Sequence, residues 1–164
     1  LSCGTKKNQI ENDTEQTKVV TLIKTELKIL VKIPYCGGQR PTEEMLNRTK
    51  PVTASFDLLD QNGNTQVVNS DSLGLINLLL PIGKYQLKEL SRRMPFELFY
   101  HTGITGEKSD IKRGTKLCYE EWYNKSVMSF EITDSTLTVK ESAKLFSNCY
   151  TKNPCDTYTG PIRP

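Results

Sequence analysis

The sequence predicts an all-β protein, an antiparallel β-sandwich with one or two short helices. Apolar and polar residues alternate with a period of two in several short runs, as they do in half-buried strands. Turn signals that contain glycine separate these runs about every eight to ten residues between positions 51 and 90. The 164 residues are enough for one domain with a buried core.

The first strand is expected in the segment 18–34, KVVTLIKTELKILVKIP. The apolar residues on one parity are Val19, Ile23, Leu27, Ile29, Val31 and Ile33, and the charged residues on the other are Lys24, Glu26, Lys28 and Lys32. Its richness in β-branched residues favours a strand over a helix. The run is long, so it forms either one strand with a bulge or two strands joined at a bend.

A turn and a short helix follow this strand. Cys36-Gly37-Gly38 predicts the turn, and PTEEMLNRT, residues 41–49, predicts the helix. Thr42 is the expected N-cap, with two acidic residues placed in the first turn to favour the helix dipole.

Four more strands are expected over 52–58, 66–69, 75–80 and 85–89, separated by the turns DQNGN, SDSLG and PIGK. Their succession predicts a β-meander. The run 75–80 is almost entirely apolar, which predicts a strand in the interior of a sheet.

Residues 91–116 interrupt this rhythm with aromatic and charged side chains, and they are expected to form a long loop between strands. A short helix is expected in TKLCYEEWYNK, residues 115–125, followed by strands in VMSFEIT and STLTV. The end of the chain, NCYTKNPCDTYTGPIRP, is expected to be a tail clipped by disulfides.

The first residues, LSCG, look like the end of a bacterial lipoprotein signal peptide, in which Cys3 is the lipidated residue. Acyl chains on such a cysteine supply the apolar surface that anchors a protein stably to a membrane. The next residues are polar and lack periodicity, as in a flexible tether. The sequence therefore predicts a lipoprotein-type N-terminus and tether over residues 1–17 and a single β-sandwich domain over 18–164.

The stretch from Phe56 to Glu89 resembles transthyretin-like (prealbumin-like, Ig-like) modules, which include carboxypeptidase regulatory-like and Cna-B-type domains. The most specific match is LP-x-G-x-Y-x-L-x-E, carried by Leu80, Pro81, Gly83, Tyr85, Leu87 and Glu89. The resemblance covers about a quarter of the chain and implies a fold rather than an activity. The start YCGG-x-RPTEE and the C-x5-C tail are similar to uncharacterised lipoproteins of Bacteroidetes-type bacteria.

Beyond Cys3, the four cysteines Cys36, Cys118, Cys149 and Cys155 predict two disulfides, with three connectivities open. A local Cys149–Cys155 loop would leave Cys36 to pair with Cys118, and the other two pairings would tie the tail to the body of the protein. A four-thiolate zinc site usually needs two closely spaced cysteine pairs, whereas Cys36 and Cys118 stand alone. Disulfides are therefore expected, and no metal site.

The sequence offers no clear catalytic constellation. His101 is the only histidine, so a Ser-His-Asp or Cys-His enzyme would have to be built on it, in a segment that reads as a loop. The net charge of +3 is small and its lysines are spread along the chain, which predicts no nucleic-acid partner. No catalytic residue and no cofactor are predicted.

The candidate ligand contacts are mostly aromatic: Phe96, Phe99, Tyr100, His101, Trp122 and Tyr123. Exposed aromatic rings act as stacking platforms for sugars, and polar neighbours orient the ligand. The competing interpretation is that Trp122, the only tryptophan, packs across the core of the sandwich.

Together these observations predict a non-enzymatic, lipid-anchored protein of the bacterial cell envelope, in the periplasm or on the outer surface. Its role would be structural or that of a binding module for a glycan or an envelope protein. The alternative is a small envelope hydrolase or an accessory subunit that acts on peptides or polysaccharide. Three Asn-x-Ser/Thr sequences also leave room for a secreted eukaryotic protein with glycans.

Overall fold

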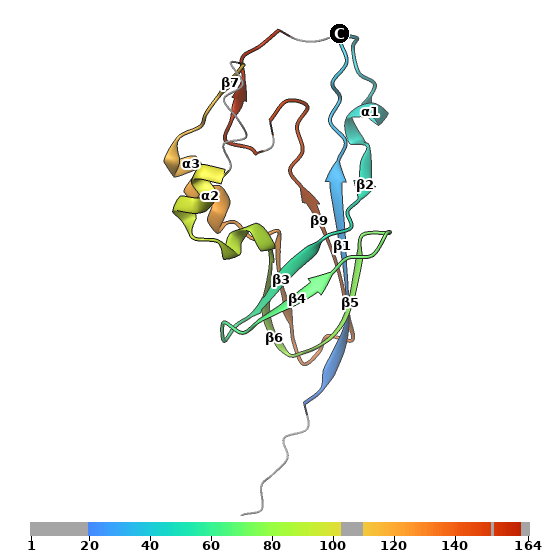
Figure 1. Cartoon of the computed structure of the whole chain (residues 1–164). Helices are drawn as coiled ribbons and strands as arrows, with labels where there is room; N and C mark the ends of the chain where they lie inside the picture. The colour runs from blue at the N-terminus through green and yellow to red at the C-terminus, as the bar shows by residue number, and fades with distance from the viewer. Residues whose placement is uncertain (1–19, 103–109, 152, 162–164) are drawn as a thin grey trace, which may run out of the picture.

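The computed structural model describes residues 20–102, 110–151 and 153–161. Figure 1 shows a two-layered body of strands, with a cluster of helices beside one of its ends. Cys3 and the tether predicted over residues 1–17 lie outside the described residues. Among the described residues, no helix is long and apolar enough to cross a membrane.

The first sheet is built around β1 (Leu22–Lys32), a single unbroken strand. β5 (Leu75–Pro81) runs antiparallel to β1 on one side, and β9 (Thr138–Leu145) runs parallel to it on the other. The short β2 (Thr49–Pro51) pairs with the last residues of β1.

The second sheet has the order β4-β3-β6-β8, and all its pairs are antiparallel. Its strands are β3 (Ser55–Asp60), β4 (Thr65–Asn69), β6 (Gly83–Glu89) and β8 (Met128–Ile132). The predicted β-sandwich is therefore confirmed.

The two sheets enclose the main core with side chains of a single parity from each strand. Leu27 and Ile29 of β1 are fully buried, as their alternation with lysine and glutamate predicts. The opposite sheet contributes Phe56, Leu58, Tyr85, Leu87, Phe130 and Ile132. Period-two alternation thus identified the buried face of β1 in advance.

The predicted β-meander is wrong beyond its first hairpin. β3 and β4 are joined by the DQNGN turn, with Gly63 at φ 83°, but β5 crosses to the other sheet and β6 crosses back. The crossing at 70–74 is held by Ser70 and Asp71: Ser70 Oγ accepts from Ala54 N at 2.9 Å, and Asp71 Oδ1 accepts from Leu73 N and Leu75 N. Local turn signals did not show that this turn changes sheets.

β5 is also not an interior strand. Among the described residues it pairs only with β1, and its side chains alternate in burial, with Ile76 and Leu80 buried and Leu79 63% exposed. Its apolar run therefore covers both the core and one outer face. Composition alone could not separate an edge strand with apolar outer residues from a central strand.

The predicted helices at 41–49 and 115–125 are present. α1 (Glu43–Asn47) begins after Thr42, whose side chain accepts from Met45 N, and α3 (Lys116–Asn124) begins after Thr115, which caps it in the same way. The segment predicted as a long loop instead contains the 3₁₀ helix η1 (Leu90–Arg93) and α2 (Phe96–Thr102). His101 consequently lies on a helix and not in a loop.

The tail completes a second structural unit, which lies beside the sandwich. β10 (Thr157–Tyr158) pairs with β7 (Ile111–Lys112), between α2 and α3 in sequence. Cys36 is bonded to Cys149 and Cys118 to Cys155, so the local Cys149–Cys155 loop does not form. We call η1, α2, α3, β7 and the tail residues 149–158 the helical unit. Its tail is covalently tied both to the end of β1 and to α3.

Candidate functional site

Most of the predicted ligand-contacting aromatics form the core of the helical unit. α2 supplies Phe96, Phe99 and Tyr100, and α3 supplies Tyr119, Trp122 and Tyr123, at the spacings of three and four residues that place side chains on one helix face. The Phe99 ring lies 5.1 Å from both Trp122 and Tyr123. These rings pack against one another and do not form an exposed platform. The same spacing in the sequence was the signal that could have indicated a helix pair.

The competing interpretation expected Trp122 to pack across the core of the sandwich, and the structure places it elsewhere. It belongs to the core of the helical unit and is half-buried. His101 is exposed at the end of α2, with its ring 5.6 Å from the ring of Tyr100. The structure thus separates His101 from the other candidates, which it brings together.

Arg92 of η1, which no sequence pattern singled out, occupies the centre of this aromatic group. Its guanidinium carbon lies 4.3 Å from the Trp122 ring and 4.5 Å from the Phe99 ring, and its side chain is only 6% exposed. Nη2 donates to Glu89 Oε2 at 2.9 Å, whereas Nε and Nη1 are buried without a hydrogen-bond partner among the described residues. Burial lowers the pKa of Arg92 and the Glu89 carboxylate opposes that shift. The cation therefore lies against two rings that also contact each other.

Arg92 lines a cleft of about 510 Å³ between α3 and the sandwich. α3 contributes Glu121 and Trp122, and the segments that begin β8 and end β9 contribute the opposite wall. The remaining lining residues are Glu89, Cys118, Lys125, Ser126, Val127, Lys144, Leu145, Phe146 and Pro154. This volume falls within the range of about 300–1,000 Å³ that is typical of small-molecule sites.

The lining of the cleft combines apolar and charged groups. Phe146 is 43% exposed and, with Trp122, offers aromatic surface. Arg92, Lys125 and Lys144 outnumber the carboxylates Glu89 and Glu121, and Glu89 is already engaged by Arg92. The cleft therefore favours a ligand with a flat apolar face and a negative charge.

A buried polar network fixes the tail beneath α3. The fully buried Tyr119 donates to Asp156 Oδ1 at 2.7 Å, and Asn153 Nδ2 donates to Asp156 Oδ2 at 2.8 Å. Gly114 N donates to the same Asp156 carboxylate at 3.1 Å. Burial, together with the Asp156 carboxylate, raises the pKa of Tyr119 to about 12. This network and the Cys118–Cys155 bond hold α3 where it forms one wall of the cleft.

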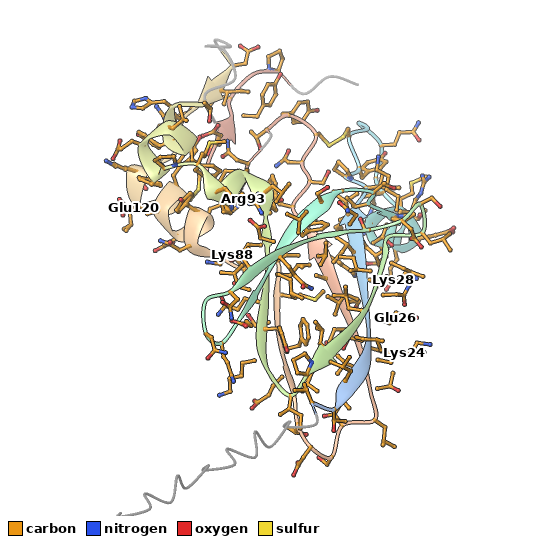
Figure 2. The ribbon with its side chains drawn as sticks, turned by 60° about the horizontal axis from the view of Figure 1, so that its bottom comes forward. Lys24, Glu26, Lys28, Lys88, Arg93 and Glu120 are labelled. Carbon is orange, nitrogen blue, oxygen red and sulfur yellow. A yellow bond between two sulfur atoms is a disulfide. The ribbon has the colours of Figure 1, made fainter. Side chains whose placement is uncertain are left out.

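Ion pairs join the helical unit to the sandwich and brace it internally. Arg93 Nε donates to Asp57 Oδ2 at 2.7 Å, which ties η1 to the buried carboxylate of β3, and Arg93 is labelled in Figure 2. Lys116 of α3 pairs with Glu97 of α2 at 2.5 Å. The walls of the cleft are thus held in place by covalent, ionic and aromatic contacts.

The only histidine of the chain, His101, lies outside this cleft. Among the residues that the structure describes, no group of three or more His, Cys, Asp and Glu side chains is placed to hold a metal ion.

No protein-family model matches the chain, and no curated protein matches it. Among solved structures, the major pilin subunit of Bacillus cereus is similar at 16% identity and a TM-score of 0.39, over 76% of this chain and 30% of the pilin. A minor pilin of Streptococcus agalactiae, GBS52, gives 16% and 0.39 over 82% of this chain and 49% of its own. The Bacillus anthracis TIE protein gives 18% and 0.34 over 74% and 16%. The chain spans less than half the length of each of these proteins.

Proposed function

We propose that this protein is a non-enzymatic binding module of the cell envelope, and that the cleft between α3 and the sandwich holds an acidic sugar residue of a glycan. The observation that carries the proposal is Arg92, a buried cation that lies against the rings of Phe99 and Trp122 in the wall of the cleft. A buried guanidinium attracts a carboxylate more strongly than an exposed lysine does, because little water screens it.

The remaining lining suits a saccharide. Phe146 and Trp122 supply aromatic surface for the apolar face of a sugar ring, and Ser126, Lys125 and Glu121 supply donors and acceptors for its hydroxyl groups. Glu89 accepts from Arg92 and His101 lies outside the cleft, so these residues do not form an acid–base pair there. Recognition without reaction is the function that this arrangement supports best.

Binding is tested by titrating the disulfide-intact protein with uronic-acid oligosaccharides and with neutral oligosaccharides of the same length. Trp122 is the only tryptophan and lines the cleft, so its fluorescence reports occupancy directly. We expect the acidic sugars to bind, and Phe146→Ala or Lys125→Gln to weaken binding at least tenfold.

The matched controls are Leu117→Ala, at an α3 position that is 64% exposed, and Lys112→Gln on β7, neither of which lines the cleft. Both controls should bind as the unmodified protein does. Equal affinity for acidic and neutral sugars, or cleft variants that bind normally, would rule out the proposed site.

The location of the protein is part of the proposal. Two disulfides in the folded chain support an oxidising compartment outside the cytoplasm. We propose that Cys3 carries the lipid that anchors the module. The mass of the N-terminal peptide from natively expressed, detergent-extracted protein tests this, and an unmodified Cys3 thiol there would contradict it.

A further inference from the structure

Five lysines form a regular row on the outer face of the β9-β1-β5 sheet. Lys24, Lys28 and Lys32 lie on β1, and Lys140 and Lys144 lie on β9; all five are exposed. The parallel register places Lys140 beside Glu26 and Lys144 beside Leu30. Read along β1, a lysine therefore occurs at every second position, alternating between the two strands. Figure 2 shows Lys24, Glu26 and Lys28 in line along this face.

Strand geometry fixes the spacing of this row. A strand advances about 3.3 Å per residue, so successive lysines are about 6.6 Å apart along the strand direction. The two strands that carry them are only about 4.8 Å apart in the perpendicular direction. The row spans the length of β1 from Lys24 to Lys32, about 26 Å. Flexible lysine side chains easily cover the sideways step.

The row is a concentration of unneutralised charge. Glu26 is the only acidic residue among the residues of β1, β5 and β9 that face outward with the lysines. Five lysines and one glutamate give this face a net charge of +4, whereas the net charge of the whole chain is +3. None of the five lysines forms an ion pair with another described residue. Sequence order hid the row, because β9 lies more than a hundred residues after β1 and pairs with it in parallel.

We propose that this row of lysines binds a linear phosphodiester polymer whose phosphates repeat every six backbone bonds, as in poly(glycerol phosphate). A peptide advances about 3.3 Å per three backbone bonds when extended, so six bonds of an extended chain cover the same distance as two residues of a strand. Each phosphate can then lie opposite one lysine along the row. Lys144 also lines the cleft, whereas the other four lysines of the row do not, so the row does not depend on the sugar that we propose for the cleft.

Two observations favour a polymer without bases over a single-stranded nucleic acid, which has the same number of bonds per repeat. The outward residues of β1, β5 and β9 include no aromatic ring, so bases would find no stacking platform. The two disulfides place the protein where extracellular polymers are the accessible partners.

The test measures the affinity of the disulfide-intact protein for poly(glycerol phosphate) as a function of salt. If five phosphates are contacted, the logarithm of the association constant should fall with the logarithm of the salt concentration with a slope of about −3.5. Lys24→Gln/Lys28→Gln should reduce this slope to about −2 and weaken binding at least tenfold at low salt. Both changes lie on an exposed face, and a circular dichroism spectrum and thermal unfolding confirm that the variant is folded.

The control is Lys84→Gln/Lys112→Gln, which changes the net charge equally but lies on β6 and β7. We expect its slope and affinity to match those of the unmodified protein. Poly(ribitol phosphate), with eight backbone bonds per repeat, should bind more weakly because its phosphates fall out of step with the lysines.

Any of four results would overturn the proposal. These are no binding at low salt, an equal loss of affinity in the control variant, equal affinity for the six-bond and eight-bond polymers, and equal or tighter binding of an oligothymidylate. The last result would identify the row as a nucleic-acid site instead. A failure of sugar binding at the cleft leaves every one of these outcomes unchanged, so the two proposals are tested separately.

Discussion

The phenol of Tyr119 on α3 donates a 2.7 Å hydrogen bond to the carboxylate of Asp156 in the tail, 37 residues later in the chain. Tyr119 is fully buried, and Asn153 and Gly114 complete the coordination of the same carboxylate. This contact joins the helix that forms one wall of the cleft to the segment beneath it. It also makes the stability of the helical unit depend on pH.

The first prediction concerns alkaline pH. The pKa of Tyr119 is about 12 in the folded protein, above the ordinary value of 10.0, so the folded state favours the neutral phenol. Its contribution to the free energy of unfolding is complete below pH 10 and is lost as the pH rises to about 12. Chemical denaturation at stepped pH, followed by Trp122 fluorescence, should show this loss.

The matched comparison is Tyr119→Phe against Tyr35→Phe, because Tyr35 lies after β1, outside the helical unit, where its phenol donates an exposed hydrogen bond to Gln39 O at 2.8 Å. At neutral pH Tyr119→Phe should lower the free energy of unfolding by about 1 kcal/mol through the lost hydrogen bond. It should also abolish the part of the alkaline destabilisation that depends on Tyr119. A Tyr119→Phe protein with the same alkaline profile as the parent would contradict the assignment.

The second prediction separates the two disulfides. The bonded cysteines are 113 residues apart in Cys36–Cys149 and 37 apart in Cys118–Cys155. Chain entropy gives stabilisations of up to about 5 and 4 kcal/mol respectively, with about 2–5 kcal/mol as the usual range for removing a native bond. Cys118→Ser/Cys155→Ser should increase amide exchange in α2 and α3 while β1, β3 and β6 keep their protection. Loss of protection across the whole sandwich in that variant would show that the helical unit and the sandwich do not unfold separately.

The third prediction compares two glycines with similar backbone angles. Gly74 has φ 75° and Gly63 has φ 83°, both in the left-handed region that disfavours other residues. A Cβ at Gly74 would collide with the carbonyl oxygen of Ile29, whereas a Cβ at Gly63 meets nothing within 4 Å. Gly63→Ala should therefore cost about 1 kcal/mol of backbone strain, and Gly74→Ala at least twice as much. Urea denaturation of both variants measures the difference, and equal losses would contradict the close approach at the sheet crossing.

The fourth prediction concerns Arg92. Lysine has no planar cation to lie against the rings of Phe99 and Trp122, so Arg92→Lys should destabilise the helical unit by about 1–2 kcal/mol and shift the emission of Trp122. Arg92→Met keeps the packing without the buried charge and should retain stability within about 1 kcal/mol. Arg92→Met should also lose affinity for acidic sugars. If Arg92→Lys leaves both emission and stability unchanged, the stacking contributes little.

The strands that were predicted correctly are those in which the alternation of apolar and charged residues is consistent with only one buried face. In β1 the lysines and Glu26 face outward and Leu27 and Ile29 face inward, so periodicity identified both the strand and its buried face. The N-cap Thr42 was also predictable, because capping depends on residues only three positions apart.

The features that were not predictable depend on contacts between distant segments. The sheet change at residues 70–74, the edge position of β5 and the parallel pairing of β1 with β9 are set by packing and not by local propensity. The same holds for the cleft, which gathers Arg92, Trp122 and Phe146 from three separate segments. The aromatic residues of α2 and α3 form a core and not a surface because the two helices pack against each other, which is also a contact between distant segments.

The Cys36–Cys149 bond also determines how the protein carries a mechanical load. A pulling force applied at the start of β1 and at the end of the tail passes along β1 to Cys36, through this bond and into the tail from Cys149, without entering residues 37–148. β1 is already an extended strand, so the ladders that join it to β5 and β9 lie outside the path that carries the force. About 380 Å of chain is thereby kept from extending until the bond is reduced. Attached at both ends, the module would behave as a short, stiff link.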